Sequence, residues 1–484
     1  MGIIAKQTSQ NILTIGIAFM FGGINTLVFY PAFLSAEAYG LVVFLLATSN
    51  LLMPLIGFGI HQAIIRYYSS YQDKEMQQRF MYSVILLPLL IALLMGGICI
   101  AFYHSIVNNL SIQNPIIADY TWVIFVVAVA TAYFEVFYAW ARVQLQSVLG
   151  NVLKEIYPRL FLFLLLIALY FFDLSFDQFI ITLVIGYFIR LLLMILLANH
   201  YYPVRIRFHF PSNFRSILIY SATILLAAFA GSLIIDIDKF MIPQMREIQQ
   251  TAFYAIAIFA ATLVEVPARA MQQILNPLVA TAVNENNPTE VNNLYKKSAL
   301  NLVVVSGWFF LLVNLNSEAL FSLLPDVGYQ TATSVVLYIS LAKLLTMIFG
   351  CGSAIISNSS FYQITLVFSI FMALGVTLLN IVWIPLYGID GAALATLVVI
   401  GASILLKMAY LYYKIYAHPL SWNMCKSLIV VGILFVVFES FDFTVSPVLQ
   451  IVLTSALVSV VYFVIVVQLK LSNDLLRLLH RVIK

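Results

Sequence analysis

About fourteen long apolar runs follow one another along this chain of 484 residues, and they constrain its fold more than any other feature. A helix needs about 20 apolar residues to cross the hydrocarbon core of a bilayer. The runs are continuously apolar and lack the two-residue alternation of barrel strands, so helices are expected. They centre near residues 20, 52, 92, 130, 162, 188, 226, 262, 310, 344, 371, 402, 432 and 457. The sequence therefore predicts an all-α membrane protein with about 14 transmembrane helices.

The composition argues against a water-soluble fold and against several chemical functions. Charged residues make up 9% of the chain, against about 25% in soluble domains. Cys99, Cys351 and Cys425 are scattered without CxxC spacing, which indicates neither a disulfide framework nor a metal site. No nucleotide-binding loop and no HExxH pattern is found, so neither a cofactor nor enzyme activity is expected. The charge of +4 is spread over loops, and nucleic-acid binding is not expected.

Basic residues between the runs predict the orientation of the chain. Alternate connections contain Arg66, Lys74 and Arg79, then Arg142 and Lys154, then Arg205, Arg207 and Arg215, then Lys296 and Lys297, then Lys414 and Lys426. The intervening connections contain no Lys or Arg, except the one with Lys239 and Arg246. By the positive-inside rule the first set faces the cytoplasm. We expect a multi-pass inner-membrane protein with both termini in the cytoplasm.

Three weak matches at a constant offset predict an internal duplication. Residues 38–45 resemble 253–260, the stretch from Glu75 resembles that from Glu290, and TLVIG ending at Gly186 resembles LVVIG ending at Gly401. The differences 254 − 39, 290 − 75 and 401 − 186 are all 215. Transporters commonly pair two related bundles around a central cavity. The predicted division is an amino-terminal lobe of six spans (1–200), a cytoplasmic linker (201–215), a carboxy-terminal lobe of six spans (216–415), two additional spans (416–470) and an amphipathic cytoplasmic tail (471–484).

The stretch NIVWIPLYGIDGAALATLV from Asn380 is the most specific motif of the chain. Together with the two lobes, IIDIDKFMI around Asp238 and PLVATAVNENN, it resembles the multidrug/oligosaccharidyl-lipid/polysaccharide exporter superfamily, in its branch of O-antigen-type flippases. The motif residues are Asn380, Pro385, Tyr387, Gly388, Gly391, Ala392, Ala393 and Thr396. The resemblance implies a prokaryotic inner membrane and a lipid-linked sugar cargo. A structural interpretation also fits: Pro385 ends a helix, a tight turn follows, and small residues allow close packing.

Basic residues at membrane depth are candidates for binding such a cargo, because ionisable groups there are costly and usually face a cavity or a partner. Arg190 and Lys343 lie near the middle of spans six and ten. Arg66, Arg142, Arg159 and Arg269 lie nearer the cytoplasmic ends of their spans, and Lys239 lies at the end of the seventh. Such groups can replace the water around a diphosphate. The alternatives are snorkelling for Arg66, Arg142 and Arg159, and a pair with a carboxylate on another helix for Arg190 and Lys343.

The acidic residues suggest ion coupling. Glu135 precedes Arg142 by seven residues, and Glu265 precedes Arg269 by four, so each pair could form a salt bridge on one helical face. Asp236 and Lys239 are three apart. These pairs are either static, or Glu135, Glu265 or Asp238 exchanges H⁺ or Na⁺ during transport.

The leading hypothesis is a flippase for undecaprenyl-diphosphate-linked oligosaccharide that works by alternating access. Its partners would be that lipid, the surrounding membrane lipids and other polysaccharide-assembly proteins. One alternative is a multidrug exporter of the same superfamily, which carries cations and would need a lumen rich in carboxylates. A membrane-embedded glycosyltransferase or polymerase is a further alternative, but the external connections here are short.

Overall fold

The computed structural model describes residues 3–71, 73–144, 146–201, 203, 211, 213–325, 327–441, 445–472 and 474. These residues form helices joined by short turns, which confirms the all-α class. Thirteen described segments are long and apolar enough to cross a membrane. The expected span near residue 162 is not among them: α8 (Ser147–Phe171) has the length of a span but contains Lys154, Glu155 and Arg159.

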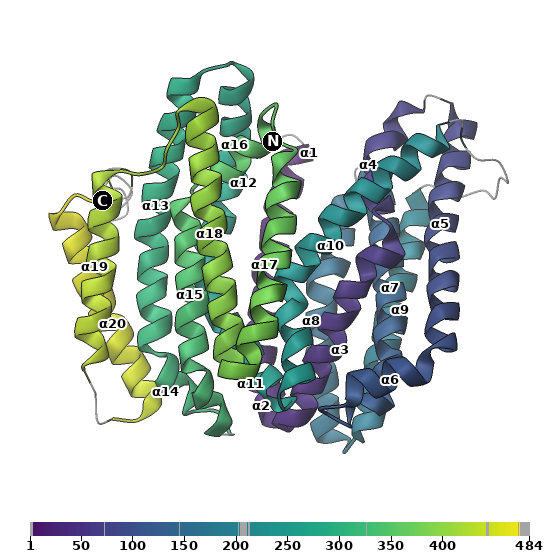
Figure 1. Ribbon diagram of the computed structural model, residues 1–484, viewed down its shortest axis with the longest axis horizontal. Coiled ribbons are helices and arrows are strands. Elements are labelled where there is room, and N and C mark those ends of the chain that lie inside the picture. The colour runs from purple at the N-terminus through teal and green to yellow at the C-terminus, as the bar shows by residue number, and fades with distance from the viewer. Residues whose placement is uncertain are drawn as a thin grey trace. The chain divides into compact units, whose positions relative to one another are not determined.

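Contacts divide the chain into two compact units, residues 1–252 and 253–484. In the first unit α3 packs against α7 and α10, α8 packs against α1 and α9, and α7 also contacts α4 and α9 (Figure 1). The elements up to the boundary are α1 (Ile3–Ile24), η1 (Asn25–Phe29), α2 (Tyr30–Phe33), α3 (Ala36–Gly57), α4 (Ile60–Tyr67), η2 (Tyr68–Ser70), α5 (Lys74–Ala101), α6 (Tyr103–Ser111), α7 (Ile117–Val143), α8, α9 (Phe176–Tyr201) and α10 (Phe214–Met245).

Local sequence explains where α3 begins and ends. Ser35 caps its first turn by accepting a hydrogen bond from the Ala38 amide at 3.2 Å. Phe58 and Gly59 both adopt left-handed backbone conformations, with φ of 47° and 66°, and this ends the helix. A Cβ on Gly59 would lie 2.5 Å from the Ser221 carbonyl oxygen of α10. Only glycine, which has no side chain, lets α10 approach this closely at the turn from α3 into α4.

In the second unit α13 contacts α12, α15, α19 and α20. The two C-terminal helices, yellow in Figure 1, lie beside α13 through an apolar cluster that includes Leu311, Val431, Val458 and Tyr462. The elements are α11 (Gln249–Thr262), which crosses the unit boundary, η3 (Leu263–Glu265), α12 (Val266–Asn284), α13 (Pro288–Leu315), α14 (Ser317–Phe321), η4 (Val327–Ala332), α15 (Thr333–Ile348), α16 (Gly352–Asn358), α17 (Ile364–Tyr387), α18 (Ile389–Ile415), α19 (Trp422–Glu439) and α20 (Pro447–Gln468).

The motif from Asn380 forms the hairpin between α17 and α18. Helix α17 does not end at Pro385 as expected, but continues to Tyr387, and the chain reverses at Gly388 with φ of 61°. A proline ring disturbs the turn that precedes it, so a helix can run a few residues past one. A Cβ on Gly391 would lie 2.1 Å from the Trp383 carbonyl oxygen. The expected close packing of small residues is confirmed, since Ala392 and Ala393 are fully buried.

Helix starts keep the spacing of the sequence repeat. Helices α5, α8 and α9 begin at 74, 147 and 176, and α13, α17 and α18 begin at 288, 364 and 389, which gives offsets of 214, 217 and 213. Helix α10, the first span of the expected second lobe, packs against α3 and α4 within the first compact unit. The lobe boundaries at 200 and 216 stay a prediction. Most of the linker 201–215 and of the tail 471–484 lies outside the described residues.

Candidate functional site

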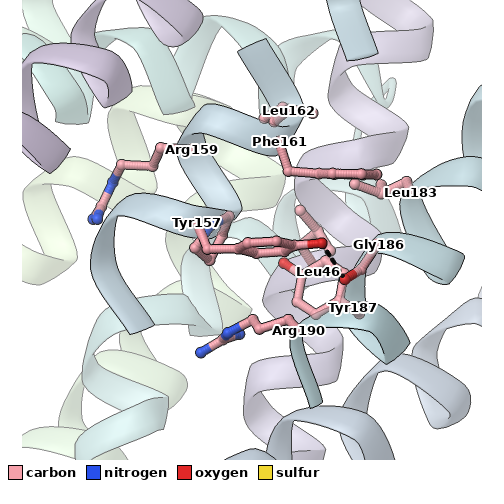
Figure 2. Close-up of a pocket in the computed structure, with 10 residues that line it drawn as sticks. Leu46, Tyr157, Arg159, Phe161, Leu162, Leu183, Gly186, Tyr187 and Arg190 are labelled. Atoms are coloured by element: carbon pink, nitrogen blue, oxygen red, sulfur yellow. Dashed lines mark hydrogen bonds between the residues drawn. The ribbon is translucent and has the colours of Figure 1, made fainter. Parts of the chain in front are cut away.

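A cavity of about 170 Å³ opens in the first unit, lined mainly by α8 and α9 (Figure 2). The Tyr157 hydroxyl of α8 donates a hydrogen bond to the Gly186 carbonyl oxygen of α9 at 3.1 Å. The wall combines two guanidinium groups and three aromatic rings with aliphatic side chains: Leu46, Tyr157, Pro158, Arg159, Phe161, Leu162, Leu183, Gly186, Tyr187 and Arg190. An apolar wall with a few basic groups suits a ligand that is both anionic and partly apolar.

Arg190 is the most buried basic residue of this wall, with 6% of its surface exposed. Its Nε donates a hydrogen bond to the Leu153 carbonyl oxygen at 3.0 Å, and its guanidinium carbon lies 3.8 Å from the centre of the Phe134 ring. Within the described residues it forms no salt bridge with a carboxylate. A guanidinium held by a ring face and one carbonyl keeps further donors for an anion.

Several polar contacts lie close to Pro158 of α8. A proline inside a helix removes one backbone hydrogen bond and opens the preceding turn. Around it, Arg159 donates to the carbonyl oxygen and the carboxylate of Glu155, at 2.6 and 2.9 Å. Asn25, the first residue of the π-helix η1, is buried and donates to the Arg159 carbonyl oxygen at 2.7 Å. The Asn25 Oδ1 accepts no hydrogen bond from the described residues. Asn25 is thus a polar residue of the first span that lies next to the cavity.

A second set of charged groups lies at the ends of α7 and α8 near α4. Glu135 forms a salt bridge with Lys154 at 2.6 Å, and the Tyr138 ring lies 5.4 Å from Lys154 and 5.7 Å from Arg142. Burial lowers the pKa of His61 from 6.5, Glu135 acts to raise it, and Lys154 and Arg142 lower it further. The lowered pKa favours the neutral form of His61 at pH 7. The Glu135–Lys154 pair thus adds one acid and one base next to Phe134 and Leu153, two residues that contact Arg190.

The expected pair of Glu135 with Arg142 is wrong, because Glu135 pairs with Lys154 of the neighbouring helix. Residues seven apart on an α-helix are separated by about 10 Å along its axis, at about 1.5 Å per residue. Arg142 instead lies against Tyr138 and is exposed. Lys154 was expected only as a loop residue, and nothing in its local sequence indicates which carboxylate it reaches.

The expected pair of Asp236 and Lys239 is confirmed, with Nζ 2.7 Å from Oδ1. Asn50 of α3 donates to the other carboxylate oxygen of Asp236 at 3.3 Å. Asp238, an ion-coupling candidate, is 5% exposed on the same helix. Arg66, at the end of α4, lies with its guanidinium carbon 4.3 Å from the centre of the Tyr220 ring and is exposed. None of these residues lines the cavity between α8 and α9.

In the second unit Lys343 of α15 forms a salt bridge with Glu265 at 2.7 Å, and their side chains are 28% and 29% exposed. The expected Glu265–Arg269 salt bridge is not found among the described residues, although the charge of Arg269 lies near enough to act on Glu265. Glu265 ends the 3-10 turn η3, which places it in a different phase from the helix α12 that carries Arg269. Arg269 is exposed and forms no salt bridge within the described part of the chain. For Lys343, the alternative of a pair with a carboxylate on another element is the arrangement found.

Sequence reasoning did not single out Lys407 of α18. Its Nζ lies 3.8 Å from the Met372 sulfur and 5.6 Å from the centre of the Phe368 ring. A lysine inside an apolar run is itself a signal, so this residue could have been found. Among the described residues, no group of three or more His, Cys, Asp or Glu side chains is placed to hold a metal ion.

Gly186 controls the shape of the cavity and provides a first test. A Cβ at this position would lie 2.2 Å from the nearest atom of the Phe161 ring. We expect Gly186→Ala to displace that ring and to destabilise the protein by about 1–3 kcal/mol, as overpacking does. Gly231→Ala is the matched control, because its Cβ would meet no atom within 4 Å. The midpoint temperature of thermal unfolding should fall for the first variant only.

A second substitution shows whether the ring is the cause. Phe161→Leu in the Gly186→Ala background removes the ring that the new methyl group meets, and it should recover most of the lost stability. A double variant as unstable as Gly186→Ala would contradict this account of the wall.

Comparisons with known proteins place the chain in a family. Residues 4–284 match the family described as polysaccharide biosynthesis protein. A structure of the lipid II flippase MurJ in an inward closed conformation is similar, with 13% identity and a TM-score of 0.69, covering 95% of this chain and 99% of that one. An inward-facing multidrug resistance MATE family transporter has 15% identity and a TM-score of 0.65, covering 86% and 98%. A MOP superfamily transporter from Pyrococcus furiosus has 14% identity and a TM-score of 0.57, covering 86% and 95%. No curated protein sequence matches.

At these identities the structures show a common fold, that of membrane flippases and exporters. The family match covers more than half of the 484 residues. Together with the membrane-spanning helices, this confirms the resemblance that the motif from Asn380 indicated. The chain therefore belongs to the polysaccharide biosynthesis protein family, as a multi-pass protein of the inner membrane.

Proposed function

We propose that this protein is a flippase for oligosaccharide units linked to undecaprenyl diphosphate, such as O-antigen or capsule repeat units. The observation that carries the proposal is the basic wall of the cavity between α8 and α9, where Arg190 is buried without a carboxylate partner among the described residues. A diphosphate must lose its water to cross a membrane, and guanidinium groups can replace that water with charge-assisted hydrogen bonds.

The charge balance of this region favours an anion. Arg159 and Arg190 of the wall and the neighbouring Lys154 give three positive charges, and Glu135 and Glu155 give two negative ones, so the net charge is +1. Both acids are already paired with a basic residue. A multidrug exporter of cations, the main alternative, would need free carboxylates at this place, and a membrane-embedded glycosyltransferase or polymerase would need catalytic groups.

The apolar part of the wall fits the lipid part of such a cargo. Phe161, Leu162 and Leu183 provide aliphatic and aromatic contacts next to the basic groups. The name of the similar MurJ structure refers to lipid II, which supports a lipid-linked cargo for this chain. Assembly with other polysaccharide-assembly proteins remains part of the proposal.

Ion coupling is also proposed, through the acids that lie at membrane depth. Glu265 is the strongest of the three candidates, because its partner Lys343 could be replaced by H⁺ or Na⁺ during transport. Glu135 is held by Lys154, and Asp238 is buried on α10.

The decisive experiment measures lipid-linked oligosaccharide in a bacterial host deleted for this gene. We expect the units to accumulate on the cytoplasmic face, and the intact gene to reverse the accumulation. An unchanged lipid pool together with altered drug tolerance would instead identify an exporter of the multidrug kind. Membrane level of the protein should be followed throughout, so that loss of folding is separated from loss of transport.

A further inference from the structure

Two adjoining cavities in the second unit are lined by neutral polar and apolar side chains. The first, of about 300 Å³, lies between α12 and α16 and includes Gln272, Asn276, Ser353 and Ser357. The second, of about 550 Å³, lies at the turn from α12 to α13 and the end of α16, and Asn358 lines both. Each falls in the size range of ligand pockets, about 300–1,000 Å³. We call the two together the amide groove.

The amide groups of the groove are available for a ligand. Gln272, Asn276, Asn284 and Asn286 make no side-chain hydrogen bond to the described residues, and all four are exposed. Asn358 uses only its Nδ2, which donates to the Ala354 carbonyl oxygen at 2.8 Å. A carboxamide offers both donors and an acceptor, so it can bind two neighbouring hydroxyl groups of a sugar at once.

The described lining of the groove is uncharged. No Lys, Arg, Asp or Glu is found among the described residues that line either cavity. Phe361 adds an aromatic ring to the second cavity. Uncharged hydrogen-bonding groups beside an aromatic ring suit a neutral polyhydroxyl compound and give a phosphate nothing to neutralise it.

The groove continues a polar stripe on α12. Arg269, Gln272 and Asn276 are spaced three and four residues apart, so they share one face of the helix, and all three are exposed. Ala268, Leu275 and Val279 lie on the buried side. In a membrane protein an exposed polar stripe must face water or a ligand, because lipid cannot satisfy its hydrogen bonds. The stripe therefore extends from the guanidinium of Arg269 to the carboxamides of Gln272 and Asn276.

We infer that the amide groove binds the sugar part of the cargo. This inference rests on the proposed flippase function and adds to it a site for the uncharged glycan, separate from the basic cavity of α8 and α9. The groove ends at the α12–α13 turn, next to the connection with Lys296 and Lys297 that the charge pattern predicts to be cytoplasmic. Glycans built in the cytoplasm would meet the groove on that side.

Binding of two lipid probes to the full chain in nanodiscs tests the inference. One probe is bare undecaprenyl diphosphate, and the other carries a neutral oligosaccharide unit isolated from the gene-deleted host. We expect the second to bind about 10- to 100-fold more tightly, which corresponds to a few net hydrogen bonds. Gln272→Leu combined with Asn276→Leu should abolish this preference and leave the affinity for the bare lipid unchanged.

The control variant is Gln363→Leu, an exposed amide near the start of α17 that lines neither cavity. It should keep the preference for the glycan-bearing probe. Equal binding of both probes by the unaltered protein, or a preference that survives in the double variant, would overturn the sugar site while leaving the flippase function in place. Failure of both probes to bind would instead contradict the proposed function itself.

Discussion

Replacement of Arg190 by alanine is expected to reduce export of lipid-linked oligosaccharide by roughly 30- to 150-fold, because loss of a buried charged donor to an anion costs about 2–3 kcal/mol. Arg190 is the least exposed basic residue of the cavity wall, and within the described residues it forms no salt bridge with a carboxylate. Arg190→Lys keeps the charge but loses the planar fork, so we expect an intermediate loss. The measurement is the amount of lipid-linked unit on the cytoplasmic face in a host that carries each variant.

A control must separate anion binding from packing, since Arg190 also holds α8 and α9 together. Phe134→Leu removes the ring 3.8 Å from the guanidinium but leaves the charge in place. We expect it to lower the midpoint of thermal unfolding while export stays within a few-fold of normal. If Phe134→Leu and Arg190→Ala lose export equally, the role of Arg190 is structural, and the basic-wall proposal fails.

Most of the spans could be predicted from the sequence, because an apolar run depends on residues close together in the chain. The apolar runs predicted the positions of the helices, and Arg190 and Lys343 were recognisable as charged residues within those runs. The salt-bridge partners could not be predicted, because they are set by which helices pack side by side. Lys154 reaches Glu135 across the contact of α8 with α7, although the local sequence suggested Arg142.

Local backbone geometry was a second source of error. The pair of Glu265 with Arg269 assumed one continuous helix, whereas a 3-10 turn ends at Glu265 and changes the direction of its side chain. Pro385 was expected to end a helix that in fact runs on to Tyr387. Proline is visible in a sequence, but its effect depends on whether the neighbouring packing keeps the helix together.

The Lys343–Glu265 pair gives the other large expected effect. Lys343→Ala should abolish export, and it should also lower the amount of folded protein, because it leaves a partly buried carboxylate without its partner. Glu265→Gln should abolish export as well if the carboxylate exchanges an ion. Both variants are measured for membrane level and for lipid-linked oligosaccharide on the cytoplasmic face.

The double variant Lys343→Ala with Glu265→Ala distinguishes a salt bridge that only stabilises the fold from one that takes part in transport. Removing both charges leaves no unpaired carboxylate, so the protein should return to its normal level in the membrane. A static pair predicts that export returns together with the level. We expect instead that export stays abolished, because neither a cation for the cargo nor a carboxylate for H⁺ or Na⁺ remains at this place. Export restored to normal in the double variant would reduce the pair to a structural contact, and the ion-coupling proposal would then rest on Glu135 and Asp238.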